Sequence, residues 1–352
     1  MKINILSSNF KYPNVRSFLY PLIKFRKYFK SNGFNFVFNP KKICKDCDVI
    51  FIESNFYGQR WKNEENNILE EIADLKKKIG KVIYFDTSDS TSLLNPNVIN
   101  HIDKYCKGQI LKDKTEYKKK FYGNRIFTDF CKKKYNIVDD DISYSAPVKT
   151  QKDIEKIDIF WNSSISNYSI LGKVMNECYN YFPIKQMLFP PQKKINKTKD
   201  REIFFRMNMK YSRMTVQWHR EQAEKKLNPN KECSRINIFQ YFNELSRSKV
   251  SISPFGWGEI NYRDFETFLC GSLLIKPKMN HLKTWPNFYR DGTDLITYDW
   301  SCNDLHKKVS EIINNYNQFK HIAINGQKNY IDFLKNKDLK EKILIKLKNI
   351  IE

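Results

Sequence analysis

The first half of the chain alternates short apolar runs with segments of helical periodicity. The apolar runs predict buried strands at residues 3–6, 34–38, 49–53 and 81–86. Between them, residues 15–30 and 62–79 have a helical pattern, and the second segment places Ile68, Ile72 and Leu75 on one face. Further elements run through residues 105–111. Strands that alternate with helices predict a parallel sheet, so this half is expected to form one Rossmann-like domain.

A second series of strands and helices follows a polar, proline-containing stretch. Pro190 and Pro191 precede a lysine-rich run, which places a domain boundary there. Beyond it, the pattern predicts strands and helices at 202–206, 211–226, 236–247, 250–253, 295–298, 305–315 and 321–334. The final segment repeats apolar residues every fourth position, at Leu339, Ile343, Leu347 and Ile351. The expected division is a domain over 1–190, a second over 191–330, and a terminal helix over 331–352.

Composition supports a folded protein that works in the cytoplasm. The chain has 352 residues, 41% of them hydrophobic and 15% aromatic, which is enough for two cores. No stretch approaches the ~20 apolar residues that span a bilayer, and the N-terminus enters a strand pattern without a signal peptide. We therefore expect a cytoplasmic protein, soluble or peripheral at the membrane.

The cysteines predict neither disulfides nor a zinc site. Eight of them are scattered over a long chain without secretory features, so reduced thiols are expected. Cys44 and Cys47 form a CxxC pair, but the sequence has no second pair of ligands at the spacing of a structural zinc site. A structural zinc site is therefore not expected.

The net charge of +23 predicts an anionic partner without naming it. Lysine is dispersed, which is typical of a solvated surface, whereas arginine is concentrated between residues 201 and 263. The arginines of this stretch are Arg201, Arg206, Arg213, Arg220, Arg235, Arg247 and Arg263. Because arginine binds phosphate as a planar, bidentate donor, a pyrophosphate pocket explains this concentration, although Arg235 and Arg247 also fit a helix surface.

The richest segment is SISPFGWGEINYRDFETFLCGSLLIKP, residues 251–277. It predicts a buried strand, a turn whose glycines let a ligand approach the backbone, a helix from Tyr262 that ends at Gly271, and a second strand. Ligands collect at the carboxyl ends of strands in such units, where Glu259, Arg263 and Glu266 lie. An ordinary unit with an Arg263–Glu266 surface ion pair is the alternative.

This segment resembles the donor-site motif of GT-B glycosyltransferases, especially the exostosin-like and family-1-like groups. Their pattern is roughly S-P-x-G-x-G-E, then Y-R-x-x-E, then a small-residue turn and proline. The resemblance implies two Rossmann-like domains whose parallel sheets face a central cleft, and a nucleotide-sugar donor bound by the second domain. It implies that Glu266 holds the ribose hydroxyls, and that Gly258, Glu259, Tyr262 and Arg263 belong to the donor site. It covers about the last 150 residues well.

Glycosyl transfer needs positive charge for the leaving diphosphate and a base for the acceptor hydroxyl. Arg206, at the end of a predicted strand, is the best phosphate ligand, and Arg213 and Arg220 follow on a helix, where a solvated face is equally compatible. Asp86 and Asp89, in DTSDST after the strand, are the candidate bases. The same residues suit a helix N-cap. Asp103 and Lys107 are weaker candidates for the same cleft.

Two other features are less specific. Asp139, Asp140 and Asp141 could suggest the metal motif of GT-A enzymes, but no strand precedes them, so a solvated turn is expected. The basic, aromatic segment 18–30 fits an anionic lipid or acidic glycan as well as it fits a core helix. For the terminal helix, bracing the first domain is preferred to lying on a membrane.

The resemblance therefore implies a metal-independent glycosyltransferase, with no metal and no other cofactor expected besides the nucleotide-sugar substrate. Its expected partners are a nucleotide sugar and a saccharide or lipid-linked glycan acceptor, with an anionic membrane surface as a further partner. The alternative is a basic nucleic-acid-binding protein without catalytic activity, which lacks a recognisable binding motif. A glycosyltransferase-like scaffold without activity is a third interpretation.

Overall fold

The first half of the chain forms a six-stranded parallel sheet with the order β2-β1-β3-β4-β5-β7. In this computed structural model, the described residues are 1–8, 12–38, 44, 46–179, 181, 194–227 and 235–352. The strands are β1 (Lys2–Leu6), β2 (Asn35–Phe38), β3 (Val49–Glu53), β4 (Val82–Asp86), β5 (Lys104–Lys107) and β7 (Ile157–Ile159). Every residue of β3 and β4 is buried, as expected for central strands covered on both faces.

Helices cover both faces of this sheet. One face packs against α1 (Pro13–Lys24) and α2 (Arg26–Ser31), and the other against α4 (Glu65–Ile79) and the short α5 (Pro96–Ile99). Phe18 and Phe29 lie in the first of these cores, so the basic, aromatic segment is a core element. It was predicted as one helix, but the backbone breaks at Phe25, whose φ of −101° and ψ of 14° lie outside the helical region.

The second half forms a four-stranded parallel sheet with the order β12-β10-β9-β8. Its strands are β8 (Arg201–Phe204), β9 (Ser248–Ile252), β10 (Leu273–Pro277) and β12 (Ile296–Tyr298). Around them lie α9 (Met214–Leu227), α10 (Ile238–Arg247), α11 (Tyr262–Cys270), α12 (Leu305–Asn314) and α13 (Tyr316–Lys335). The predicted α/β class with two parallel sheets is confirmed. The predicted boundary at residue 190 lies outside the described residues.

Segments of each half pack on the other half. Strand β6 (Gln109–Leu111) pairs antiparallel with β11 (Leu282–Thr284). Helix α6 (Ile126–Tyr135) belongs to the first half, but its Phe127 and Cys131 lie in the same hydrophobic cluster as Phe255 and Phe265 of the second half. These contacts fix the two sheets relative to each other.

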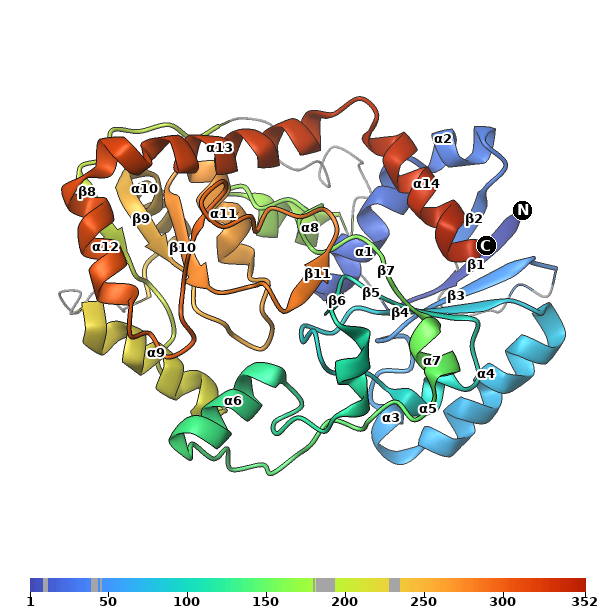
Figure 1. Cartoon of the computed structure of the whole chain (residues 1–352). Coiled ribbons are helices and arrows are strands. Elements are labelled where there is room, and N and C mark those ends of the chain that lie inside the picture. Colours follow the sequence, from blue (N-terminus) through green and yellow to red (C-terminus); the bar gives the residue numbers. More distant parts are fainter. Residues whose placement is uncertain (9–11, 39–43, 45, 180, 182–193, 228–234) are drawn as a thin grey trace.

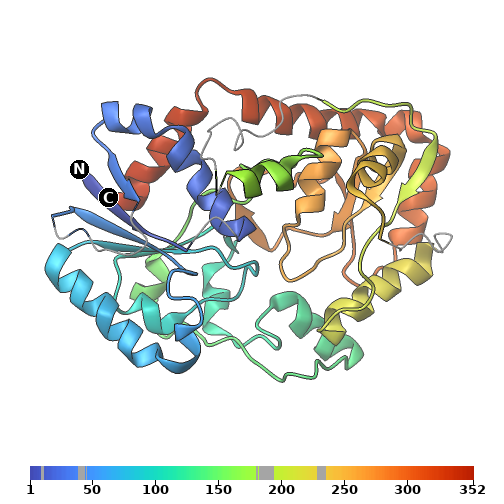
Figure 2. The ribbon, with the colours of Figure 1, turned by 180° about the vertical axis from the view of Figure 1, so that it is seen from behind.

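The terminal helix α14 (Leu339–Ile351) returns to the N-terminal sheet. Its Leu339, Ile343, Leu347 and Ile350 are buried in the cluster formed by α1 and the first strands. Figures 1 and 2 both show α14 beside α1 and α2, with α13 running across the top of the molecule. Because the apolar face of α14 is buried in the core, that face is not available to a membrane. Among the described residues, no helix combines the length and apolarity needed to cross a bilayer.

The remaining short helices lie in the connections of the first half and after its last strand, β7. They are α3 (Arg60–Asn63), a 3-10 turn (Lys114–Lys118), α7 (Gln151–Glu155) and α8 (Gly172–Cys178). Two predicted boundaries were displaced: strand β8 ends at Phe204, and α9 begins at Met214. Arg206 and Arg213 therefore lie on the loop between them, and only Arg220 lies on the helix.

Candidate active site

The predicted strand-turn-helix-strand segment is confirmed as β9, a loop, α11 and β10. Helix α11 begins after Asn261, whose backbone N–H donates to the Asp264 carboxylate at 3.0 Å. It ends at Gly271, which adopts a φ of +62° as expected for a glycine C-cap. The loop 253–261 therefore lies at the carboxyl end of the second sheet, beside the N-terminus of α11, where parallel α/β folds bind ligands.

Arginines from three parts of the chain converge on this loop. Arg125 donates to the Gly256 carbonyl at 2.8 Å, and its guanidinium lies 4.9 Å from the centre of the Trp257 ring. The Arg213 guanidinium lies 4.7 Å from the same ring. A Cβ added at Gly256 would lie 3.4 Å from Nη2 of Arg220. We refer to Arg125, Arg206, Arg213, Arg220 and Arg263 as the arginine cluster.

Two members of the cluster, Arg206 and Arg263, are linked through the Arg206 backbone. Arg263 donates to the carbonyl of Arg206. Arg206 forms a bidentate pair with Glu244 of α10, with N–O distances of 2.5 and 2.8 Å. Arg206 is therefore oriented by Glu244, a partner that the sequence did not indicate.

Positive charge in the cluster exceeds the negative charge that contacts it. Burial, together with the charge of Arg213, lowers the pKa of Arg125 to about 10. Arg213 and Arg220 hydrogen-bond the backbone carbonyls of Gly123 and Asn208, both at 2.6 Å. Because carbonyls carry no net charge, an anion such as a phosphate would be stabilised here.

Glu266 lies on α11 beside this cluster. Its Oε2 accepts a hydrogen bond of 2.6 Å from the hydroxyl of Tyr241. Burial raises the pKa of Glu266, although the Tyr241 bond and the charge of Arg263 act in the opposite direction. The side chain is half-buried, so it can present a carboxylate to a ligand hydroxyl.

Glu259 faces the first domain instead. Its Oε2 accepts a bond of 3.0 Å from the Thr91 N–H and one of 3.3 Å from Nε2 of Gln109, and Oε1 lies 3.6 Å from the His281 ring. Burial acts to raise the pKa of Glu259, but His281 and the Thr91 bond outweigh it and lower the pKa. Its visible role is to join the two domains.

Gly258 also serves the domain contact. A Cβ at this position would lie 2.0 Å from the Asp89 carbonyl oxygen, a distance that no side chain tolerates. The space beside this glycine, which was expected to admit a ligand, is occupied by the loop 86–91. At Gly256 the nearest atoms are the polar ends of side chains, at 3.3 Å or more, so that glycine borders the arginine cluster.

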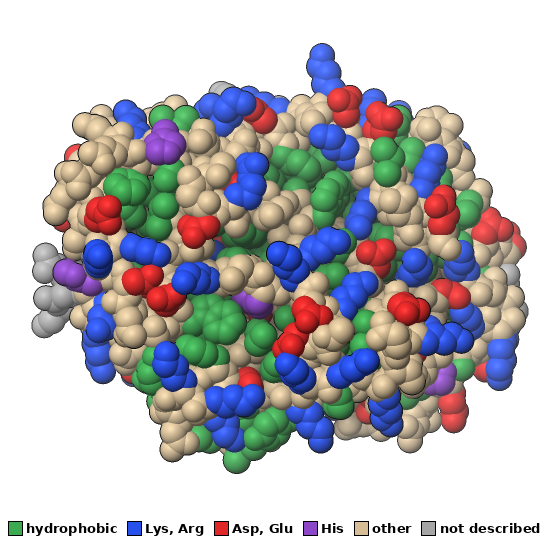
Figure 3. Space-filling model, viewed as in Figure 1, with side chains coloured by type: hydrophobic (Ala, Val, Ile, Leu, Met, Phe, Trp, Pro, Cys, Tyr) green, Lys and Arg blue, Asp and Glu red, His purple; other side chains and the backbone are tan. Residues whose placement is uncertain are grey.

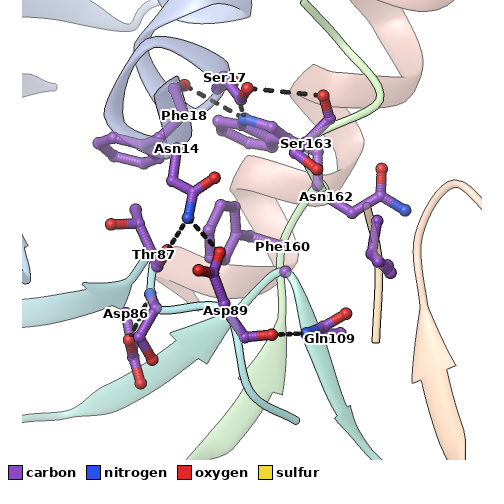
Figure 4. A pocket seen from close by; sticks show the side chains of 14 residues that line it. Asn14, Ser17, Phe18, Asp86, Thr87, Asp89, Gln109, Phe160, Asn162 and Ser163 are labelled. Atoms are coloured by element: carbon purple, nitrogen blue, oxygen red, sulfur yellow. Dashed lines mark hydrogen bonds between the residues drawn. The ribbon is translucent and has the colours of Figure 1, made fainter. Parts of the chain in front are cut away.

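Tyr262 and Asp89 are brought together through Asn14. The Tyr262 hydroxyl donates to Oδ1 of Asn14 at 2.8 Å. Nδ2 of Asn14 donates to Oδ1 of Asp89 at 2.6 Å, as Figure 4 shows. Asp89 is exposed and lines a cavity of about 50 Å³ between the domains. Its carboxylate is therefore held in place and open to solvent.

Asp86 is in a different situation. It is buried, and its Oδ2 accepts bonds from the fully buried Lys107 at 2.8 Å and from the Tyr105 hydroxyl at 2.7 Å. Burial acts to raise the pKa of Asp86, but the Lys107 charge and hydrogen bond outweigh it and lower the pKa. No helix begins in the loop 86–91; the next one, α5, is capped by Asn95.

The weaker candidates are structural. Asp103 pairs with Lys76 and accepts from the Val82 N–H, which lies at the amino end of β4, away from the cleft. A solvated turn was expected for Asp139, Asp140 and Asp141. Asp140 and Asp141 are exposed, but the prediction was wrong for Asp139. It is buried, and Oδ1 accepts from the Thr215 N–H at 2.8 Å and from its hydroxyl at 2.9 Å. The adjacent α9 offers unpaired N–H groups, which explains why a carboxylate is buried there.

Arg125, Tyr241, Glu244 and Asn14 are the main residues that the sequence reasoning missed. Arg125 was not considered, because only the arginines between residues 201 and 263 were taken together, yet this residue, directly before α6, contacts the loop of the second half. The one feature of the sequence that marks Arg125 is its isolation, since no other arginine lies between it and Arg201. In the described part of the chain, no group of three or more His, Cys, Asp or Glu side chains is placed to hold a metal ion.

Comparison with known proteins gives similar folds at low identity. No family model and no curated protein matches the chain. The Anabaena HepE protein in complex with UDP-glucose matches at 10% identity and a TM-score of 0.45, over 99% of this chain and 100% of that one. TarM matches at 10% identity and a TM-score of 0.43, over 86% of this chain and 54% of that one. A trehalose-phosphate synthase (UDP-forming) from Burkholderia vietnamiensis matches at 8% identity and a TM-score of 0.39, over 96% and 80%. Because these TM-scores are below 0.5, the function of this chain is inferred from the geometry of its own site.

Proposed function

We propose that this protein is a glycosyltransferase that moves a sugar from a nucleotide-sugar donor to a saccharide or glycolipid acceptor. One observation carries the proposal. The loop 253–261 of the second domain, which the arginine cluster contacts, lies against a loop of the first domain that presents the Asp89 carboxylate. Opposite charges thus come from the two domains and meet at the carboxyl ends of both sheets, as a two-domain transferase of the GT-B type requires.

The donor is proposed to bind on the second domain. Its diphosphate would be held by Arg213, Arg220 and Arg263, whose charge neutralises the leaving group in the transition state. Glu266 would accept the ribose hydroxyls, in the role that the resemblance implies. The arginines supply charge of the kind that a metal ion supplies in other transferases, so we propose a metal-independent mechanism.

Asp89 is the proposed base. It would accept the proton of the acceptor hydroxyl as that oxygen attacks the anomeric carbon and the diphosphate departs. Asn14 orients its carboxylate, and Tyr262 of the second domain in turn orients Asn14. Asp86 is not proposed, because Lys107 already neutralises it.

A thermal-shift panel of UDP, GDP, ADP, CMP and their sugars tests the donor site. At least one nucleotide should stabilise the wild type, and Glu266→Ala and Arg263→Ala should each reduce that stabilisation. Arg247→Ala is the matched control, because Arg247 lies in the same domain but pairs with Asp200 on the surface. If no nucleotide stabilises the wild type, the proposal fails.

A nucleic-acid-binding protein remains the competing function on the basis of charge. Figure 3 shows lysine and arginine spread over one face and mixed with acidic residues, rather than gathered in one stripe. Salt-dependent retention on both DNA and RNA, without protection by any nucleotide, would favour that alternative.

The proposal places the enzyme in the cytoplasm, where nucleotide sugars would be its donors. An anionic membrane surface is proposed as a further partner only for a lipid-linked acceptor. Vesicles that contain anionic lipid should then retain the protein, and neutral vesicles should not.

A further inference from the structure

A cavity of about 490 Å³ lies at the carboxyl edge of the first sheet. It is open to solvent. Its lining comes from β4 and β5 and the residues that follow β3 and β4, from α3 and the starts of α4 and α5, and from the loops on either side of α6. Its size falls in the range of small-molecule sites, about 300–1,000 Å³. We call it the basin.

The lining of the basin combines aromatic rings with amides and hydroxyls. Trp61 and Tyr144 offer partly exposed rings, and Asn55, Asn95 and Asn124 offer amide groups. Rings with an apolar face and a few converging polar groups suit a ligand that has both C–H faces and hydroxyls. A sugar ring has this character.

The charge of the lining residues limits which saccharides fit the basin. Although the chain has 62 lysines and arginines, none of the described residues that line the basin is a lysine or an arginine, and the charged ones among them are Glu65 and Asp86. Two lysines that do not line the basin contact residues that do. The fully buried Lys107 pairs with Asp86, and on the rim Lys132 donates a hydrogen bond of 2.8 Å to the Tyr144 hydroxyl. An acidic ligand would therefore meet the Glu65 carboxylate and find no cation within the lining, which disfavours its binding.

The basin adjoins both parts of the proposed active site. Asp86 and Ser88 line it on one side and line the cavity between the domains on the other, so the loop that carries Asp89 forms the shared wall. At its other end, Asn124 follows Gly123, whose carbonyl accepts from Arg213 of the arginine cluster. A ligand in the basin thus lies across the loop 86–91 from Asp89, and one residue along the chain from the carbonyl that Arg213 contacts.

We infer that the basin binds the acceptor, and that the acceptor is an uncharged saccharide rather than an acidic or phosphorylated glycan. That the bound saccharide is an acceptor rests on the proposed function. That the basin binds a saccharide rests only on the residues that line it. The positive charge of the chain therefore serves the donor and the outer surface, and does not select an acidic acceptor.

Isothermal titration of the full chain with defined tetrasaccharides tests the inference. The neutral probes are maltotetraose, cellotetraose and N-acetylchitotetraose, and the acidic probe is tetragalacturonate. We expect at least one neutral probe to bind and the acidic one not to bind. Trp61→Ala and Tyr144→Ala should each weaken neutral binding by about tenfold, through loss of ring stacking.

Two further variants sharpen the test. Phe239→Ala removes an exposed ring on α10, far from the basin lining, and should leave binding unchanged. Ala146→Lys places a cation on the exposed rim and should admit tetragalacturonate. The inference is overturned if no neutral probe binds, if the acidic probe binds the wild type more tightly, or if both aromatic variants bind as the wild type does.

The nucleotide panel separates the two proposals. Saccharide binding without any stabilisation by nucleotides would leave the basin as a carbohydrate site and sink the transferase proposal. Stabilisation by a nucleotide without binding of any neutral saccharide would support the donor site and overturn the saccharide site in the basin.

Discussion

Asp86 and Asp89 are three positions apart, yet they differ in what surrounds them. The Asp86 carboxylate is 6% exposed and pairs with Lys107, whose side chain is fully buried. Removing one member of such a pair leaves an uncompensated charge and costs about 3–5 kcal/mol. We therefore expect Asp86→Asn to lower the free energy of unfolding by about 3 kcal/mol or more, measured by urea denaturation.

Asp89→Asn is the matched variant, because its carboxylate is exposed and bonded to a neutral amide. We expect it to change stability by less than about 0.5 kcal/mol, to leave nucleotide binding intact and to abolish most turnover. Full turnover in Asp89→Asn would remove this residue as the base. An unchanged stability in Asp86→Asn would contradict the structural role of Asp86.

His219 makes the stability of the protein depend on pH. Its ring is fully buried on α9, and neither ring nitrogen has a hydrogen-bond partner among the described residues. Burial, with the charges of Arg220 and Lys276, lowers the pKa of His219 to about 3 from an ordinary 6.5. Below pH 6.5, His219 is therefore protonated in the unfolded chain but stays neutral in the folded protein until the pH approaches 3.

Stability is consequently lost as the pH falls below 6.5, by about 2 kcal/mol between pH 7 and pH 5 for this group. We expect His219→Phe to remove that part of the pH dependence, and to be neutral or stabilising at pH 7 because two unpaired polar atoms disappear. Urea titrations at both pH values check this. Equal pH dependence in the two proteins would show that His219 is not the titrating group.

The loop between β9 and α11 joins the domains as much as it binds ligands. Gly258→Ala would force a methyl group against the Asp89 backbone, so the loop 86–91 must move. We expect a loss of about 1–3 kcal/mol of stability and a large fall in kcat, with a smaller change in nucleotide affinity. Steady-state kinetics and thermal shift separate these effects.

Gly256→Ala provides the comparison within the same loop. An added Cβ would meet the ends of the Asn261 and Arg220 side chains at 3.3 and 3.4 Å. Nucleotide affinity should therefore fall more than stability does. If both glycine variants lowered nucleotide affinity equally, Gly258 would belong to the donor site after all.

Elements with strong local patterns were predicted well. The apolar runs of β3 and β4 and the spacing of α14 follow from burial on both faces of a sheet or on one face of a helix. The ends of β8 and α9 were displaced, because the residues of the intervening loop make contacts with distant segments, such as Arg213 with Gly123. No local pattern carries that information.

At the scale of the whole molecule, the terminal helix completes the core of the first domain. Leu347 of α14 is fully buried, whereas Ile345 of the same helix is 52% exposed. We expect Leu347→Ala to destabilise the protein by about 2–5 kcal/mol and Ile345→Ala to change stability by less than about 0.5 kcal/mol. Thermal unfolding of both variants checks the difference, and equal effects would contradict the packing of α14.

The sequence by itself determined the alternation of strands and helices that gives two parallel sheets, and the strand-turn-helix-strand segment 251–277, although it did not indicate α6 or the edge strand β7. These follow from the period of apolar residues and from glycine at a helix end, which are local properties. The tertiary structure alone decided which charged groups are available. It buried Asp86 against Lys107, turned Glu259 towards Thr91 and brought Arg125 to Gly256. Whether a carboxylate is neutralised or exposed depends on partners far away in the chain, and only folding sets those distances.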